Sequence, residues 1–209
     1  MPIWKPIYNM KNIVNILLVC ILIGCKPSTG EIKTNNTIEA EAIKHNNKGL
    51  EFVSVLNENV DSAFYYFDRA IEIDSNYASP HSNKANLFIT LGDKKNALKE
   101  LKIVTELNPE IGESWVLYGI ALDYYGHKKE SKLAYQQGVK LLSEKIENTT
   151  NDQERDNNLL NRGCALFLLG DPKYNNDFEE LKDKESFKMH IDELTRLSKE
   201  DFLEKLMKR

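Results

Sequence analysis

Few residues of this chain have the types and spacing that catalysis or metal binding requires. The four histidines, His45, His81, His127 and His190, share no spacing typical of metal ligands, and the H-E-x-x-H pattern is absent. The G-x-S-x-G nucleophile pattern, the nucleotide-binding glycine loop and the G-x-G-x-x-G fingerprint are absent as well. We therefore predict no catalytic residue, no metal and no cofactor, and hence a protein that is not an enzyme.

The other reactive side chains are better explained as structural. Cys164 lies in an apolar stretch, and we expect it to be a small buried hydrophobe and not a reactive thiol. The adjacent carboxylates Glu179 and Glu180, and Asp192 and Glu193, would point to different sides of a helix. This favours a solvated surface over an acid–base pair.

Cys25 is the exception, because a covalent modification is expected there. Lys5 and Lys11 are the only charged residues before Lys26, and the apolar run 13–24 ends directly before the cysteine. The run is about a dozen residues, whereas a membrane-spanning helix needs roughly 20. A secretory signal peptide is therefore favoured over a retained transmembrane helix or a buried core helix.

The segment Leu22-Ile23-Gly24-Cys25 resembles the lipobox of bacterial lipoproteins. The resemblance implies that residues 1–24 are removed as a signal peptide and that Cys25 is diacylated on its sulfur and acylated on its new amine, with chains such as palmitate. Two or more acyl chains hold a protein stably at a membrane. The implied location is a bacterial membrane on its periplasmic or extracytoplasmic side. Lys26, where an aspartate would signal inner-membrane retention, favours the outer membrane.

Charge and composition exclude a nucleic-acid partner and indicate a tether. The 209 residues carry 28 basic and 32 acidic side chains, and loss of residues 1–24 would leave 26 basic against 32 acidic ones. Such a chain has no basic excess to neutralise phosphates. Beyond the lipidated cysteine, residues 25–41 are polar and aperiodic and contain Pro27 and Gly30, so we predict a flexible tether.

The rest of the chain carries an internal repeat. Segments 78–92 and 112–126 align at an offset of 34 residues, which superposes Ala85 on Gly119. Together with Trp-Val-Leu-Tyr-Gly-Ile-Ala-Leu at 115–122, this spacing resembles the tetratricopeptide repeat, a pair of antiparallel helices. The resemblance implies an all-α fold, an α-solenoid of helix-turn-helix repeats in which small residues such as Ala63, Ala85, Ala97 and Gly119 let paired helices approach closely.

We expect three repeats over 42–145, followed over 146–209 by an insertion, a degenerate fourth repeat and C-terminal helices. Asp93 and Asp171 are predicted helix N-caps, the latter followed by a proline at the first helical position. The segment 198–201, Ser-Lys-Glu-Asp, resembles a capping box that opens a final helix ending at Met207. We expect this helix to cover the exposed edge of the last repeat; a helix dedicated to a partner is the alternative.

If the chain binds proteins, the family resemblance implies a groove lined by the first helix of each repeat. Asparagine recurs there, and its amide can both donate to and accept from a peptide backbone; a compositional bias toward asparagine is the alternative explanation. The carboxylate clamp of chaperone-binding members is not expected, because only Asn83 matches its positions and Glu113 would repel a peptide carboxylate. The groove positions are Asn46, Val53, Ser79, Asn83, Asn86, Thr90, Glu113, Val116, Ile120, Tyr124, Asn157, Leu160, Asn161 and Cys164.

The resulting hypothesis is a membrane-anchored scaffold or assembly factor whose partners are other proteins or peptides of the bacterial cell envelope. An adaptor that recruits envelope hydrolases or proteases to substrates is the alternative. Self-association through the open ends of the solenoid is compatible with both.

Overall fold

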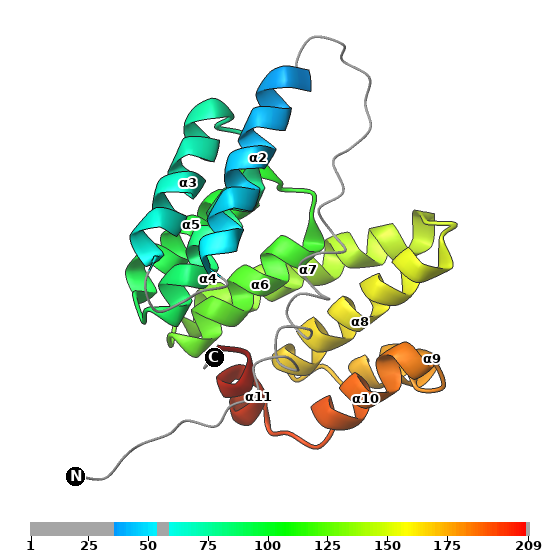
Figure 1. Cartoon of the computed structure of the whole chain (residues 1–209). Helices are drawn as coiled ribbons and strands as arrows, with labels where there is room; N and C mark the ends of the chain where they lie inside the picture. Colours follow the sequence, from blue (N-terminus) through cyan, green and yellow to red (C-terminus); the bar gives the residue numbers. More distant parts are fainter. Residues whose placement is uncertain (1–35, 54–58, 208–209) are drawn as a thin grey trace, which may run out of the picture.

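The computed structural model describes residues 36–53 and 59–207 (Figure 1). Within these ranges the chain forms ten helices and no strand. The helices are α2 (Asn36–Val53), α3 (Val60–Ile73), α4 (Ala78–Thr90), α5 (Lys94–Leu107), α6 (Gly112–Tyr124), α7 (Lys128–Asn148), α8 (Asp152–Leu169), α9 (Tyr174–Leu181), α10 (Glu185–Leu194) and α11 (Lys199–Met207).

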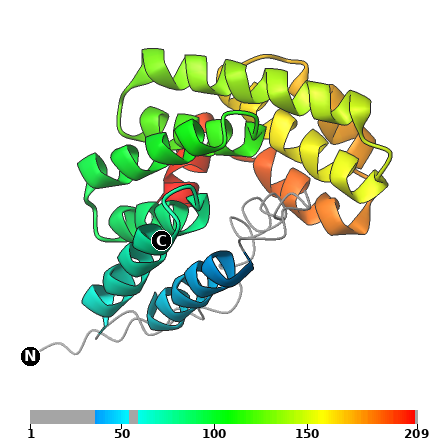
Figure 2. The same ribbon diagram turned by 90° about the horizontal axis from the view of Figure 1, so that it is seen from above.

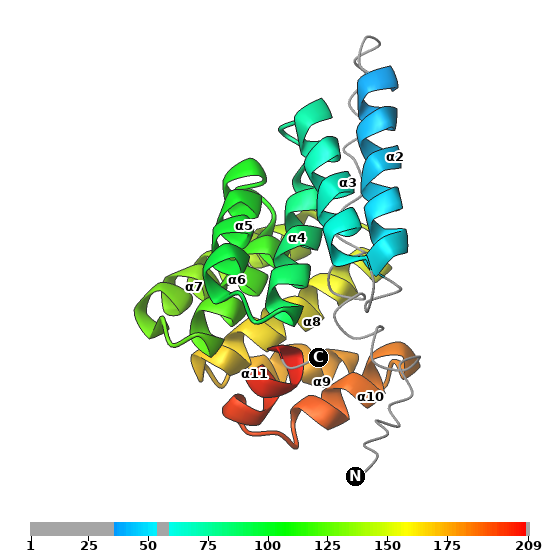
Figure 3. The same cartoon turned by 60° about the vertical axis from the view of Figure 1, so that its left-hand side comes forward.

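Successive helices pack in pairs, and the pairs stack into an arc. The most extensive contacts lie within α2–α3, α4–α5, α6–α7 and α8–α9, and also between α7 and α8. Seen from above, α6 lies on the inner side of the arc and α7 on its outer side (Figure 2). The view in Figure 3 shows the pairs following one another from α2–α3 to α8–α9. The predicted all-α solenoid is thus confirmed.

Within the helix pairs, a large side chain of one helix packs directly against a small residue of the other helix. The predicted small residues Ala63, Ala85 and Ala97 have no exposed surface. Glycine is needed where the partner is a ring: a Cβ atom would lie 2.5 Å from Phe67 at Gly49, 2.7 Å from Tyr135 at Gly119 and 2.4 Å from Phe178 at Gly163. These distances are well below van der Waals contact. Three of the four helix pairs therefore depend on the missing side chain.

Local capping explains where several helices begin and end. Asp93 is the N-cap of α5, as predicted, and accepts a hydrogen bond from the backbone N–H of Asn96 at 3.1 Å. Gly170 ends α8 in the left-handed conformation, with φ of 72°. The prediction for Asp171 is wrong: it accepts from the backbone N–H of Lys173 in a turn, and α9 begins only at Tyr174. The proline ring after Asp171 starts this turn rather than the helix.

One boundary differs from the sequence-based expectation. Helix α2 begins at Asn36, inside the stretch expected to be a tether. This difference extends a helix that is already packed, which costs little because helix propagation is cooperative. The polar insertion around 146–155 forms the end of α7 and the start of α8, and Asn151 caps α8 by accepting from the N–H of Glu154 at 2.9 Å.

The final helix forms as predicted but packs in a different place. Ser198 accepts from the N–H of Asp201 at 3.1 Å, so the capping box opens α11. The apolar face of α11 is buried, but its contacts reach α6, one repeat before the end of the solenoid. In Figures 1 and 2, α11 (red) lies on the inner side of the arc. It therefore covers part of the concave face as well as the last repeat.

The signal peptide, the lipobox and Cys25 lie outside the described residues. Within the described ranges, no helix combines the length and the apolar character needed to cross a membrane.

Candidate functional site

The candidate site is the concave groove formed by the inner faces of α2, α4, α6 and α8. Adjacent first helices touch at α2–α4 and at α6–α8, so the inner side chains of each of these two pairs share a surface. The predicted groove residues fall into two parts with different surroundings: a polar N-terminal part on α2 and α4, and an apolar C-terminal part on α6 and α8.

Two asparagines from adjacent repeats meet in the N-terminal part. The Nδ2 of Asn83 donates to the Oδ1 of Asn46 at 2.8 Å. Asn46 is 4% exposed, whereas Asn83 and the neighbouring Asn86 are half-buried. The bond uses one donor of the Asn83 amide and leaves its carbonyl oxygen and second N–H to other partners. This arrangement presents amide groups of the type that pair with a peptide backbone.

The C-terminal part of the groove is filled by the chain itself. Val116 and Ile120 are each 6% exposed, and with Leu160 and Cys164 they belong to one core cluster. The same cluster contains the apolar residues of α10 and α11: Phe187, Ile191, Leu194, Phe202, Leu203, Leu206 and Met207. Positions expected to meet a partner are therefore covered by the C-terminal helices.

Several other predicted groove residues are buried or turned toward a neighbouring helix, so they offer less surface to a partner than expected. Asn157 and Asn161 are 7% and 8% exposed, and the Oδ1 of Asn157 accepts from Gln153 at 3.3 Å. Glu113 turns toward α7, where one carboxylate oxygen lies 3.7 Å from the ammonium of Lys145. Tyr124 is half-buried with its ring against Tyr125 at 5.3 Å between centroids. Seven members of the predicted set are not buried. Thr90 is exposed, and the half-buried ones are Val53, Ser79, Asn83, Asn86, Glu113 and Tyr124.

The sequence reasoning missed a buried acidic residue at the end of α6. Asp123 is 1% exposed and forms ion pairs with Lys128 and with Lys199, whose Nζ lies 2.9 Å from Oδ2. Lys199 also donates to the backbone carbonyl of Leu168 at the end of α8. Burial alone would raise the pKa of Asp123, but the two lysines outweigh it and hold the pKa below its ordinary value. An acidic residue within the apolar end of a first helix is the sequence signal that could have pointed to it.

Lys199 thus fixes α11 against two first helices at once. Near it, the rings of Phe202 and Phe167 meet edge to face at 6.0 Å between centroids. The hydroxyl of Tyr135 donates weakly to Asp123 at 3.4 Å from the opposite side. Burial and the neighbouring carboxylate both raise the pKa of Tyr135, which keeps it a neutral donor.

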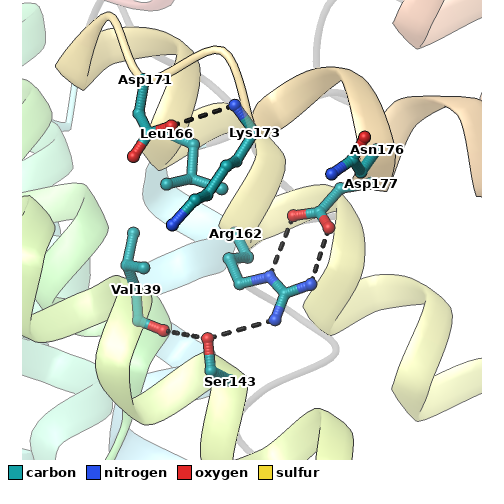
Figure 4. Close-up of a pocket in the computed structure, with 8 residues that line it drawn as sticks. All are labelled: Val139, Ser143, Arg162, Leu166, Asp171, Lys173, Asn176 and Asp177. Atoms are coloured by element: carbon teal, nitrogen blue, oxygen red, sulfur yellow. Dashed lines mark hydrogen bonds and ion pairs between the residues drawn. The ribbon is translucent and has the colours of Figure 1, made fainter.

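A cavity of about 330 Å³ lies between α7, α8 and α9, and Arg162, Ser143 and Asp177 in its lining are paired with one another (Figure 4). Arg162 donates to both carboxylate oxygens of Asp177, at 2.9 and 2.6 Å, and to the hydroxyl of Ser143 at 3.1 Å. These bonds use the guanidinium to join three helices. The lining residues are Val139, Ser143, Arg162, Leu166, Asp171, Lys173, Asn176 and Asp177.

The described residues contain no group of three or more potential metal ligands close enough to hold an ion. His81 is engaged elsewhere, since its Nδ1 lies 2.6 Å from a carboxylate oxygen of Glu100, which also pairs with Lys84 at 2.9 Å. This polar cluster links α4 to α5 and is a structural element.

Comparison with known proteins agrees with this architecture. No protein-family model matches the chain. It is 32% identical over 79 residues to the heat shock protein sti1 homolog of Schizosaccharomyces pombe, which covers 38% of this chain and 13% of that protein. It is 30% identical over 80 residues to small glutamine-rich tetratricopeptide repeat-containing protein 2 of Mycosarcoma maydis, covering 38% of this chain and 23% of the relative. The chain therefore matches less than a quarter of the length of either relative.

The structure extends the likeness over most of the chain. The solved structure of Pseudomonas aeruginosa pilF superposes with a TM-score of 0.56 and 17% identity, covering 81% of this chain and 70% of that one. The fold is a tetratricopeptide-repeat solenoid. In these terms α2–α3, α4–α5, α6–α7 and α8–α9 are successive helix-turn-helix pairs, and α11 occupies part of the concave face of the array.

Proposed function

We propose that this chain is a membrane-anchored tetratricopeptide scaffold or assembly factor that binds other proteins of the bacterial cell envelope. The observation that carries the protein-binding part is the amide surface of the N-terminal groove, where Asn46 and Asn83 from adjacent repeats meet and Asn86 is accessible. The tetratricopeptide fold supports it, since stacked repeats create extended concave binding surfaces. The membrane part rests on the lipobox sequence at Cys25.

A crosslinking pull-down from the producing cells tests the groove. The parent is compared with a variant carrying Asn83→Ala, Asn86→Ala and Tyr124→Ala, and with a matched control in which the exposed outer-helix residues Lys95 and Lys132 are replaced by alanine. We expect a defined set of envelope proteins to be captured by the parent and the control and lost from the groove variant. Equal capture by all three would show that the asparagines do not form the binding surface.

Membrane fractionation tests the anchor separately. Cys25→Ser removes the thiol that the lipobox resemblance assigns to acylation, and we expect the variant to leave the membrane fraction because no other acyl chain remains. Cys164→Ser is the matched control, since Cys164 is buried in the repeat core. Retention of the Cys25→Ser variant in membranes would contradict the lipoprotein assignment while leaving the groove hypothesis intact.

A further inference from the structure

Helix α11 occupies part of the concave face as an amphipathic helix with a lysine at its first position and another, Lys205, in its last turn. Its four apolar residues, Phe202, Leu203, Leu206 and Met207, are 4–7% exposed, and its first residue is Lys199. The spacing from Lys199 to these residues is i+3, i+4, i+7 and i+8, the pattern of a helix lying in a groove.

The surface beneath α11 is complementary to that pattern in charge and in shape. We define the α11 site as Asp123 of α6 with Phe167 and Leu168 of α8. Asp123 receives the ammonium of Lys199, the carbonyl of Leu168 accepts from the same ammonium, and Phe167 meets the ring of Phe202. The second oxygen of the Asp123 carboxylate accepts the Lys199 ammonium while Lys128 pairs with the first, so the site favours a helix that begins with a positive charge.

Helix α11 is short and has fewer contacts with α6 than the helices of a repeat have with each other. It is nine residues long, which is too short for an independent helix. Its contacts with α6 are far fewer than those within any repeat pair. Asp123 also pairs with Lys128, so the carboxylate still has a cationic partner when Lys199 moves away with α11. These features allow another helix to replace α11 without unfolding the solenoid.

We infer that the α11 site is a docking site for an amphipathic helix of a partner protein, one that begins with Lys or Arg and presents aromatic and aliphatic residues at i+3, i+4, i+7 and i+8. In the structure the chain's own α11 occupies it and competes with that partner. This inference rests on the proposed function, because it names the partner class for the C-terminal part of the same groove.

Competition with a labelled peptide of residues 196–209 tests the site. The full chain in mild detergent is titrated into the peptide and binding is followed by fluorescence anisotropy. Because the apparent dissociation constant scales inversely with the fraction of open sites, loosening α11 must strengthen binding. We expect Lys199→Ala in the protein to tighten peptide binding about tenfold, while Lys188→Ala, at an exposed position of α10, changes nothing. A peptide with Phe202→Ala and Leu206→Ala should bind at least tenfold more weakly.

Two results would overturn the inference. One is unchanged peptide binding in the Lys199→Ala protein, with circular dichroism showing that the variant is folded. The other is a parent chain that is dimeric and becomes monomeric on Phe202→Ala, because the site would then serve the α11 of a second copy. Protection of α6 amides from hydrogen exchange by the added peptide provides a second readout for any variant that folds poorly. Loss of capture in the groove variant of the pull-down is independent of these outcomes, so failure of the α11 site and failure of the proposed function are distinguishable.

Discussion

Replacing Gly163 by alanine should destabilise the last repeat, although alanine is the better helix former. The new Cβ would lie 2.4 Å from Cε1 and 2.8 Å from Cδ1 of Phe178. Carbon atoms prefer separations of about 3.5–4.0 Å, so the ring must move by about 1 Å. Phe178 is 3% exposed and packs against Tyr174 at 5.6 Å between ring centroids, which leaves it little room.

The magnitude is the difference between two opposing effects. Overpacking of a full core costs about 1–3 kcal/mol, whereas glycine to alanine in a helix gains about 0.5–1 kcal/mol. The net loss in the free energy of unfolding is therefore between about 0 and 2.5 kcal/mol, with a midpoint of about 1 kcal/mol. For a chain of this length, a loss of about 1 kcal/mol lowers the melting temperature by about 2–4 °C. Thermal and urea unfolding followed by circular dichroism measure both quantities.

A double-mutant cycle shows whether the ring is the cause. Phe178→Leu alone should destabilise by removing buried surface, but it also vacates the space that the new Cβ needs. In that background, Gly163→Ala should be neutral or stabilising, which gives a coupling energy of about 1 kcal/mol or more. The reasoning is refuted if Gly163→Ala raises the melting temperature of the parent, or if it is equally destabilising in both backgrounds.

Two further predictions concern buried ion pairs. The hydrogen bonds from His81 and Lys84 overcome the effect of burial and hold the pKa of Glu100 below its ordinary value, so its stabilising contribution is present above about pH 4.5 and is lost as the pH falls through the folded-state pKa. Glu100→Gln should therefore cost about 1–2 kcal/mol at pH 7 and progressively less in urea unfolding as the pH is lowered below 4.5; a loss that does not change with pH would contradict this. Arg162→Lys cannot reproduce the two bonds to Asp177 and should cost about 1–2 kcal/mol, a result disproved if melting is unchanged.

The repeat architecture was predictable because its determinants are local and periodic. Ala85 and Gly119 lie 34 residues apart and face a partner helix of the same repeat, so spacing alone locates the pair. Asp93 and Ser198 act on backbone groups three residues away, and both formed the predicted caps. Short-range chemistry of this kind is visible in a sequence.

The placement of α11 was not predictable, because it depends on a long-range pair. Phe202 and its apolar neighbours indicate a helix with one buried face, but nothing in the local pattern says which surface covers it. That choice depends on Asp123, a carboxylate distant in the chain whose buried position becomes evident only in three dimensions. The start of α2 at Asn36 was missed for a related reason, since a polar first turn gains its stability from the helix that follows it.

The described hydrophobic core consists of two separate clusters, and we expect the parts of the chain around them to unfold locally at different free energies. Ala63, Phe67 and Leu87 form a small cluster of their own beneath α2–α4, separate from the large cluster that runs from α4 to α11. Opening free energy follows the size of the cooperative unit. The amide protons of the first repeat should therefore exchange faster than those of the repeats that share the large cluster. Under the membrane anchor proposed at Cys25, a mechanical load would enter the chain on the N-terminal side of this first repeat and open it before the large core, which leaves the surface covered by α11 intact.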